Sequence, residues 1–252
     1  MLTSIFHPKR LTPAERSILL GRILDRTRER AAVSACPVLV FDLDGTLIDN
    51  RPRVVAILHE LGEHWRDKHP EAAARCRAAT IADIGYGVVD NLKRLGVDQA
   101  WLHDEGLSFW KQRFFTDAYQ AHDVEVPGAV KFARACHEIG ALLVYLTGRD
   151  LPGMALGTFK SLRDLGFPIG TMGVKLVTKP AFEIPDTEFK RSVARDIGRF
   201  GEVIAVFDNE PANCNLLLEA YPDCQSVFVD TQHAPDPPDL DPRVSVIDTF
   251  EM

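Results

Sequence analysis

The sequence lacks any run of about 18 consecutive apolar residues, the length that a membrane-spanning helix needs. It also lacks a basic-then-apolar N-terminal leader. Its five cysteines are scattered and include no Cys-x-x-Cys pair, so it predicts neither a disulfide framework nor a zinc site. We therefore expect no membrane partner and a cytoplasmic location, where thiols stay reduced.

A surplus of basic charge is absent as well. With 29 Lys and Arg against 36 Asp and Glu, the formal net charge of the 252 residues is −7. An acidic surface repels polyanions, so nucleic acid is not an expected partner. A small phosphorylated metabolite remains compatible, because a metal ion and a few placed donors can hold it.

Four short apolar runs without alternation are typical of strands buried on both faces of a parallel sheet. They span residues 37–41, 141–146, 203–207 and 226–229. The polar residues that follow them are Asp42, Thr147, Asp208 and Asp230. Helical patterns separate the runs, which predicts an α/β, Rossmann-like, doubly wound sheet. In such sheets ligands bind beyond the carboxyl ends of the strands, where these polar residues fall.

Residues 50–125 break this alternation, because they contain helical patterns and no buried-strand run. Such a stretch is too long for a connecting loop and indicates an inserted subdomain. We expect three helices in it, the first ending near Pro70, with Trp65, Trp101, Trp110, Phe114 and Phe115 as its core. The predicted domains are an N-terminal helical extension (1–36), a core (37–49 and 126–252) and a helical cap (50–125). Residues 231–242 should form a surface loop, and residues 244–247 a final edge strand.

The segment from Leu11 to Ala31 reads as an amphipathic helix with Thr12 as its cap and Pro13 at its first position. Packing on the main domain is the favoured interpretation. Its basic face could instead touch a membrane or belong to a transit peptide.

Asp42 and Asp44 lie two residues apart at the end of the first strand, directly before Gly45 and Thr46. Two neighbouring carboxylates repel each other unless a cation offsets their charge. Mg²⁺ suits this position, since it takes hard oxygen ligands and also binds phosphate.

The segment from Phe41 to Leu47 resembles the first motif of the haloacid dehalogenase-like hydrolase superfamily. Thr147-Gly148-Arg149 is similar to its second motif, Lys190 to its third, and Asp208-Asn209-Glu210 to its fourth. The insertion falls where this family places a helical cap. The resemblance is to the phosphatase type, because a dehalogenase needs neither a proton donor at Asp44 nor a metal.

The resemblance implies a role for each motif. Asp42 attacks phosphorus and forms an aspartyl-phosphate, while Asp44 acts as general acid and then base. Asp42, the backbone carbonyl of Asp44, and Asp208 hold Mg²⁺. The phosphoryl group is contacted by Thr147, Gly148 and Lys190. The expected activity is Mg²⁺-dependent hydrolysis of a small phosphate monoester.

Several alternatives stay open. A phosphotransferase or phosphomutase would use the same residues, and a non-catalytic phosphate-binding protein could share the fold. Lys179, followed by Pro180, competes with Lys190, which we prefer because Asp186 or Thr187 can cap its helix. Arg149 could reach phosphate, a site carboxylate or a surface partner. The sequence leaves four further points open. It does not decide whether Asn209, Glu210 or Asn213 contributes to the metal site, or whether Gly85-Tyr86-Gly87 contacts the substrate. It also leaves open the identity of the substrate and the oligomeric state.

Overall fold

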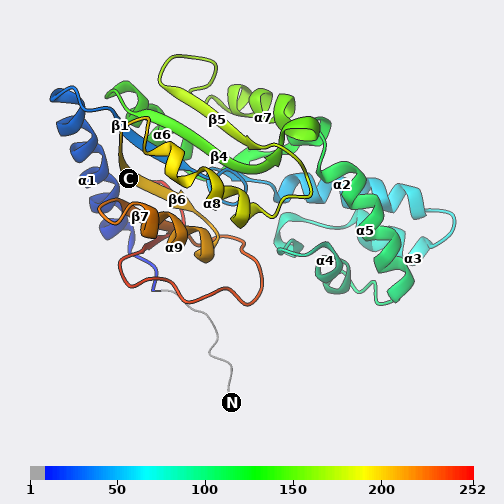
Figure 1. The fold of residues 1–252 in the computed structure, drawn as a ribbon. Coiled ribbons are helices and arrows are strands. Elements are labelled where there is room, and N and C mark those ends of the chain that lie inside the picture. Colours follow the sequence, from blue (N-terminus) through cyan, green and yellow to red (C-terminus); the bar gives the residue numbers. More distant parts are fainter. Residues whose placement is uncertain (1–8) are drawn as a thin grey trace.

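The computed structural model describes residues 9–252 and contains a six-stranded parallel sheet (Figure 1). Its order is β5-β4-β1-β6-β7-β8. The strands are β1 (Pro37–Phe41), β4 (Leu142–Asp150), β5 (Val174–Lys179), β6 (Glu202–Asp208), β7 (Gln225–Val229) and β8 (Ser245–Ile247). The predicted α/β fold with an inserted helical region is thus confirmed.

The predicted strand runs are all present, with β1 fully buried between β4 and β6. Strand β4 continues past Thr147 to Asp150 through a register irregularity. The sequence interpretation missed β5, which forms one edge of the sheet and is mostly only half-buried. An edge strand needs apolar side chains on less of its surface, so its sequence carries a weaker signal.

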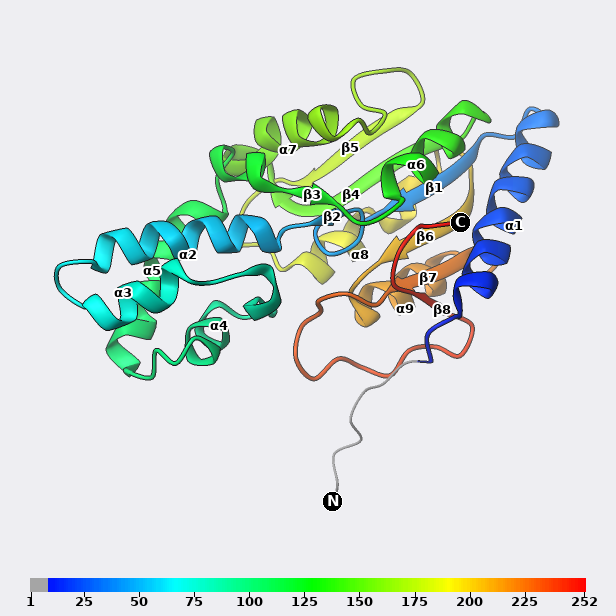
Figure 2. The same ribbon diagram turned by 180° about the vertical axis from the view of Figure 1, so that it is seen from behind.

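Helices cover both faces of the sheet (Figures 1 and 2). Helices α1 (Pro13–Ala32), α6 (Ala129–Glu138) and α7 (Leu151–Leu165) contribute to the core on one face, and α8 (Asp186–Ile197) and α9 (Pro211–Ala220) to that on the other. Successive β1 side chains alternate between these cores, as strand geometry requires. On the α6 side, Phe41 and Phe207 stack with ring centroids 4.9 Å apart, and Phe132 meets both edge-on.

The helical insertion follows β1 and precedes β4 in the sequence, and in space it lies beside the sheet (Figure 2). It comprises α2 (Arg51–Trp65), α3 (Pro70–Arg77), η1 (Ile81–Asp83), α4 (Val88–Arg94), α5 (Ala100–Phe114) and η2 (Ala118–His122). Its separate apolar core surrounds the fully buried Trp65. The chain leaves and re-enters the main domain through β2 (Ile48–Asp49) and β3 (Val124–Glu125), which pair antiparallel. The exact domain boundaries stay a prediction.

Two local expectations were wrong. The sequence interpretation placed three helices in the insertion and missed α3, which begins at Pro70. Proline is well tolerated at a first helical position, so it can begin a helix as well as end one. Helix α8 begins at Asp186 without a side-chain cap, so neither Asp186 nor Thr187 caps it. Residues 231–242 form no helix or strand, as expected.

Helix α1 packs on the main domain. Thr12 and Glu15 form a reciprocal capping box, and Pro13 takes the first helical position. Leu20 and Ile23 lie in the core of the sheet domain. Residues 1–8 of the predicted extension lie outside the described residues, so its extent stays a prediction. Within residues 9–252, no helix is long and apolar enough to cross a membrane.

We predict that Leu20→Ala lowers the free energy of unfolding by about 3 kcal/mol, because it leaves a cavity beneath α1. Leu20 is 0% exposed, whereas Ile18 on the same helix is 54% exposed. Ile18→Ala is therefore the control and should change stability by less than about 0.5 kcal/mol. Urea unfolding of both variants measures the difference. Equal effects would mean that α1 does not share the core.

Candidate active site

A single lysine joins two buried aspartates at the carboxyl edge of the sheet. Lys190 Nζ on α8 donates to Asp42 Oδ1 at 2.7 Å and to Asp208 Oδ2 at 2.6 Å. Asp42 follows β1 and Asp208 ends the neighbouring β6, so parallel pairing brings their carboxylates together. All three side chains are buried. Residues separated by up to 166 positions thus share one ion-pair cluster.

The remaining carboxylate oxygens are also held. Thr46 Oγ1 donates to Asp42 Oδ2 at 3.1 Å. Asp208 Oδ1 accepts from the backbone N–H of Glu210 at 2.9 Å and from Asn213 Nδ2 at 3.1 Å. These contacts fix the orientation of both carboxylates before any ligand arrives.

The charges of this cluster depend on one another. Burial raises the pKa of Asp42 to about 7, and the Asp208 carboxylate adds to the rise, while Lys190 opposes it. Burial also acts to lower the pKa of Lys190, but the two aspartates outweigh it and keep that pKa above its ordinary value. The lysine therefore stays cationic between the two acids.

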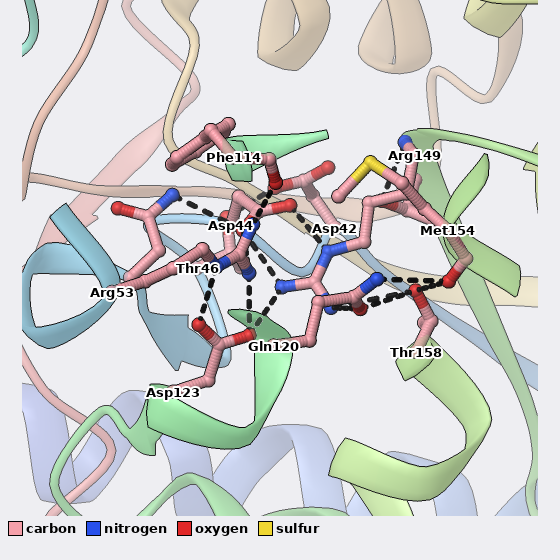
Figure 3. A network of polar contacts seen from close by, with 12 residues as sticks. Asp42, Asp44, Thr46, Arg53, Phe114, Gln120, Asp123, Arg149, Met154 and Thr158 are labelled. Atoms are coloured by element: carbon pink, nitrogen blue, oxygen red, sulfur yellow. Dashed lines mark hydrogen bonds and ion pairs between the residues drawn. The ribbon is translucent and has the colours of Figure 1, made fainter. Parts of the chain in front are cut away.

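Asp44 belongs to a second ion-pair network, shown in Figure 3. Arg149 donates two hydrogen bonds of 2.7 Å each to the Asp44 carboxylate, from Nε and Nη2. The same Nη2 donates to Asp123 Oδ2 at 2.9 Å. Asp123 in turn accepts from Arg53, at 2.8 Å from Nε and 2.5 Å from Nη2. Arg53, Asp123 and Arg149 are all buried.

This network spans the junction between the sheet domain and the insertion. Asp44 and Arg149 come from the ends of β1 and β4, whereas Arg53 lies on the first helix of the insertion and Asp123 just before β3. Burial acts to raise the pKa of Asp44, but Arg149 outweighs it and holds the pKa well below its ordinary value. In this arrangement Asp44 is ionised.

Thr147 and Gly148 line the same cavity as Asp42 and Lys190. The Thr147 hydroxyl oxygen accepts from the Arg149 backbone N–H at 3.1 Å, which leaves its own proton free to donate. A β-carbon at Gly148 would displace the Asp186 carboxylate, which pairs with Lys179.

The donor set fits Mg²⁺. Asp42 and Asp208 supply hard carboxylate oxygens, and the buried Asn213 Oδ1 beside them has no hydrogen-bond partner among the described residues. Within residues 9–252, no three His, Cys, Asp or Glu side chains gather as a metal cluster. A site here would need a backbone carbonyl or an amide oxygen to complete it, and Mg²⁺ accepts both.

The sequence comparison identifies the family. A family model described as haloacid dehalogenase-like hydrolase matches residues 36–214, which include Asp42, Lys190 and Asp208. The chain belongs to the haloacid dehalogenase-like hydrolases. A search of curated proteins found no match.

Solved structures of other proteins share the fold of this haloacid dehalogenase-like hydrolase. A phosphatase candidate from Clostridium difficile is 13% identical with a TM-score of 0.55, over 86% of this chain and 96% of that one. Protein tyrosine kinase A from Mycobacterium tuberculosis is 15% identical with a TM-score of 0.50, over 86% and 95%. A predicted phosphoglycolate phosphatase from Haemophilus somnus is 16% identical with a TM-score of 0.50, over 85% and 94%. At these identities the likeness shows the fold alone.

Among the residues singled out from this hydrolase sequence, Lys190 lies beside Asp42, whereas Lys179 does not. Lys179 Nζ instead donates to Asp186 Oδ1 at 2.8 Å. Arg149 pairs with the Asp44 carboxylate, one of the alternatives that the sequence left open. Asn209 Oδ1 lies 3.4 Å from the Thr46 hydroxyl, and the Glu210 carboxylate accepts from the Ala234 backbone N–H.

Sequence reasoning missed other parts of the site. Arg53 and Asp123 resemble ordinary surface charges in the sequence, and no pattern marks them as buried. Residues in the loop that follows β7, among them Gln232 and Ala234, line the cavity. Trp110, Phe114 and Phe115, which were assigned to the core of the insertion, also line the cavity. Trp110 and Phe114 do pack against that core but are only partly buried. Of the five aromatic residues assigned to it, Trp65 alone is fully buried, and Trp101 is 53% exposed.

We predict that Lys190→Met destabilises the metal-free protein by about 3 kcal/mol, because two buried carboxylates lose their shared cation. Added Mg²⁺ should restore part of this loss by binding the same carboxylates. Thermal unfolding in EDTA and in Mg²⁺ measures both effects. Lys179→Met is the matched control and should cost less than about 1 kcal/mol, since Asp186 is largely exposed. A larger effect for Lys179→Met would contradict the prediction.

We also predict that Asp123→Asn lowers the free energy of unfolding by about 3 kcal/mol, since two buried guanidinium groups lose their shared carboxylate. Asp49→Asn provides the comparison, because Asp49 pairs with the partly exposed Arg51 and should cost less than about 1 kcal/mol. Urea denaturation of the two variants is the measurement. Matching values would show that the junction network contributes no more than a surface pair.

Proposed function

We propose that this hydrolase is a Mg²⁺-dependent phosphatase that cleaves a small phosphate monoester through an aspartyl-phosphate on Asp42. The observation that carries the proposal is the Lys190 ammonium 2.7 Å from the Asp42 carboxylate, in the wall of one cavity. A phosphoryl group entering this cavity would meet a carboxylate nucleophile and a fixed positive charge together.

The reaction proceeds in two displacements. An Asp42 carboxylate oxygen attacks phosphorus, the bond to the leaving oxygen breaks, and that oxygen takes a proton from Asp44. Water then attacks the phosphoaspartate, gives a proton to Asp44, and releases phosphate as the Asp42–phosphorus bond breaks. Forming a covalent intermediate divides one difficult displacement into two easier ones.

The surrounding groups stabilise the charge that develops on the phosphoryl oxygens. Lys190, the Thr147 hydroxyl and the Gly148 backbone N–H are the proposed contacts. Asp42, Asp208 and the backbone carbonyl of Asp44 would hold Mg²⁺. When bound, this cation would offset the carboxylate charges and polarise the phosphoryl group.

The ion pair with Arg149 favours one of the two roles of Asp44. An ionised carboxylate is ready to accept a proton from water, as the second displacement requires. The acid role in the first displacement requires a protonated Asp44, and hence a loosened contact with Arg149. Since Arg149 is tied through Asp123 to the insertion, movement of the insertion is a route to that loosening.

The proposed substrate is a small phosphorylated metabolite, in keeping with a cavity of about 520 Å³. We also propose a cytoplasmic location, which rests on the scattered cysteines of the sequence.

We predict that the chain hydrolyses 4-nitrophenyl phosphate with Mg²⁺ and loses this activity in EDTA. Asp42→Asn should abolish hydrolysis and covalent labelling, because an amide is a poor nucleophile. Asp44→Asn should slow turnover about 10²–10⁴-fold and accumulate phosphoprotein, because water loses its base. Product release and intact-protein mass after acid quench are the measurements. Asp164→Asn, on an exposed turn of α7, is the control.

The outcomes separate the proposal from its alternatives. Preferential transfer to an added alcohol over water would make the chain a phosphotransferase. Phosphate binding without turnover or labelling would make it a binding protein. Undiminished activity of Asp42→Asn would contradict the proposed nucleophile.

A further inference from the structure

The cavity beyond Asp42 is walled on one side by the insertion. We call the apolar and aromatic residues on this side the cap wall: Val54, Tyr86, Val88, Trp110, Phe114 and Phe115. Every member is apolar or aromatic, and none carries a charge. The other insertion residues that line the cavity, Asn50, Gly85 and Asn91, are uncharged. In the proposed phosphatase, the leaving group of the substrate would lie against the cap wall while the phosphoryl group occupies the Asp42 end.

Three aromatic rings of the cap wall pack into one unit. Trp110 and Phe114 stack with centroids 4.5 Å apart, and Phe115 meets them edge-on at 5.3 and 5.0 Å. The Arg53 guanidinium lies 4.6 Å from the Phe114 ring centroid and donates to its backbone carbonyl at 3.3 Å. The buried junction network therefore holds these rings in place, and a fixed aromatic surface binds another ring at little cost in conformational entropy.

The charges around the cavity disfavour a second anionic group on the substrate. Of the described residues that line it, Lys190 and Arg149 are cationic, and both are already paired with aspartates. Asp186, Glu210 and Asp236 line it as well and are acidic. A carboxylate or second phosphate on the leaving group would face acids and apolar rings without a free cation, which costs binding energy.

We propose that the substrate is a phosphate monoester whose leaving group is an uncharged aromatic alcohol. The ring packs on Trp110, Phe114 and Phe115. Phosphorylated carboxylic acids and bisphosphates are excluded. This inference rests on the proposed phosphatase function and adds its substrate class.

Three substrates test this class. Benzyl phosphate and n-butyl phosphate both release an alkanol and differ mainly in the ring, while phosphoglycolate carries a carboxylate. We expect kcat/KM with Mg²⁺ to be at least about tenfold higher for benzyl phosphate than for either of the others. Equal or better hydrolysis of phosphoglycolate or butyl phosphate would overturn the inference and leave the phosphatase proposal standing.

Variants of the cap wall test whether its aromatic rings cause the preference for benzyl phosphate. Trp110→Leu should lower kcat/KM for benzyl phosphate about tenfold through KM, and leave butyl phosphate nearly unchanged. Trp110→Phe keeps a ring in case the leucine variant folds poorly, and should lose less. Trp101→Leu, in the same helix but 53% exposed and outside the cavity, is the control. An equal loss for both substrates in Trp110→Leu would contradict ring recognition.

A binding experiment decides the inference even without turnover. Benzylphosphonate is not hydrolysed, and calorimetry with Mg²⁺ present should show that it binds at least about tenfold more tightly than phosphonoacetate. Trp110→Leu should remove that difference. If no monoester is hydrolysed but this preference holds, the phosphatase proposal fails and the aromatic site stands. If phosphonoacetate binds as well as benzylphosphonate, the aromatic site fails.

Discussion

The site depends on one cation held between two buried carboxylates. Lys190 Nζ touches both Asp42 and Asp208, so it offsets the repulsion between acids that parallel pairing of β1 and β6 forces together. Without such a cation, two carboxylates in an apolar sheet edge would be protonated or driven apart. The sheet topology and the ion pair are therefore coupled. The same arrangement keeps the Asp42 carboxylate, the proposed nucleophile, and a positive charge close together at the cavity.

A second set of charges, buried except for the partly exposed Asp44, connects the site to the insertion. Asp44, Arg149, Asp123 and Arg53 alternate in sign and form a closed network, because Arg53 Nη2 also lies 3.4 Å from Asp44 Oδ1. Arg53, on the first helix of the insertion, touches Phe114, a ring of the cap wall. Asp44, the proposed acid and base, and the surface proposed to hold the leaving group are thus joined by one continuous set of contacts. Such a connection lets the position of the insertion influence the Asp44 carboxylate.

Family membership does not determine the substrate, which depends on individual side chains at the site. Solved structures with this fold include proteins named as a tyrosine kinase and a predicted phosphoglycolate phosphatase, so the fold does not choose the reaction partner. In this chain the cap wall carries aromatic rings and no charge. The proposed substrate class therefore rests on the cap wall and not on the sheet.

The sequence by itself determined the parallel sheet except for β5, the place of the insertion, and the strand ends that carry Asp42, Thr147 and Asp208. It did so because buried strands are apolar throughout and the polar residues that follow them fall at one edge. Only the tertiary structure decided that Lys190 rather than Lys179 contacts Asp42, that Arg149 pairs with Asp44, and that Arg53 and Asp123 are buried. A charged residue has the same local pattern on a surface as in a buried pair, since burial depends on partners distant in sequence. For the same reason, Trp110 could be assigned to the insertion but not to the cavity wall.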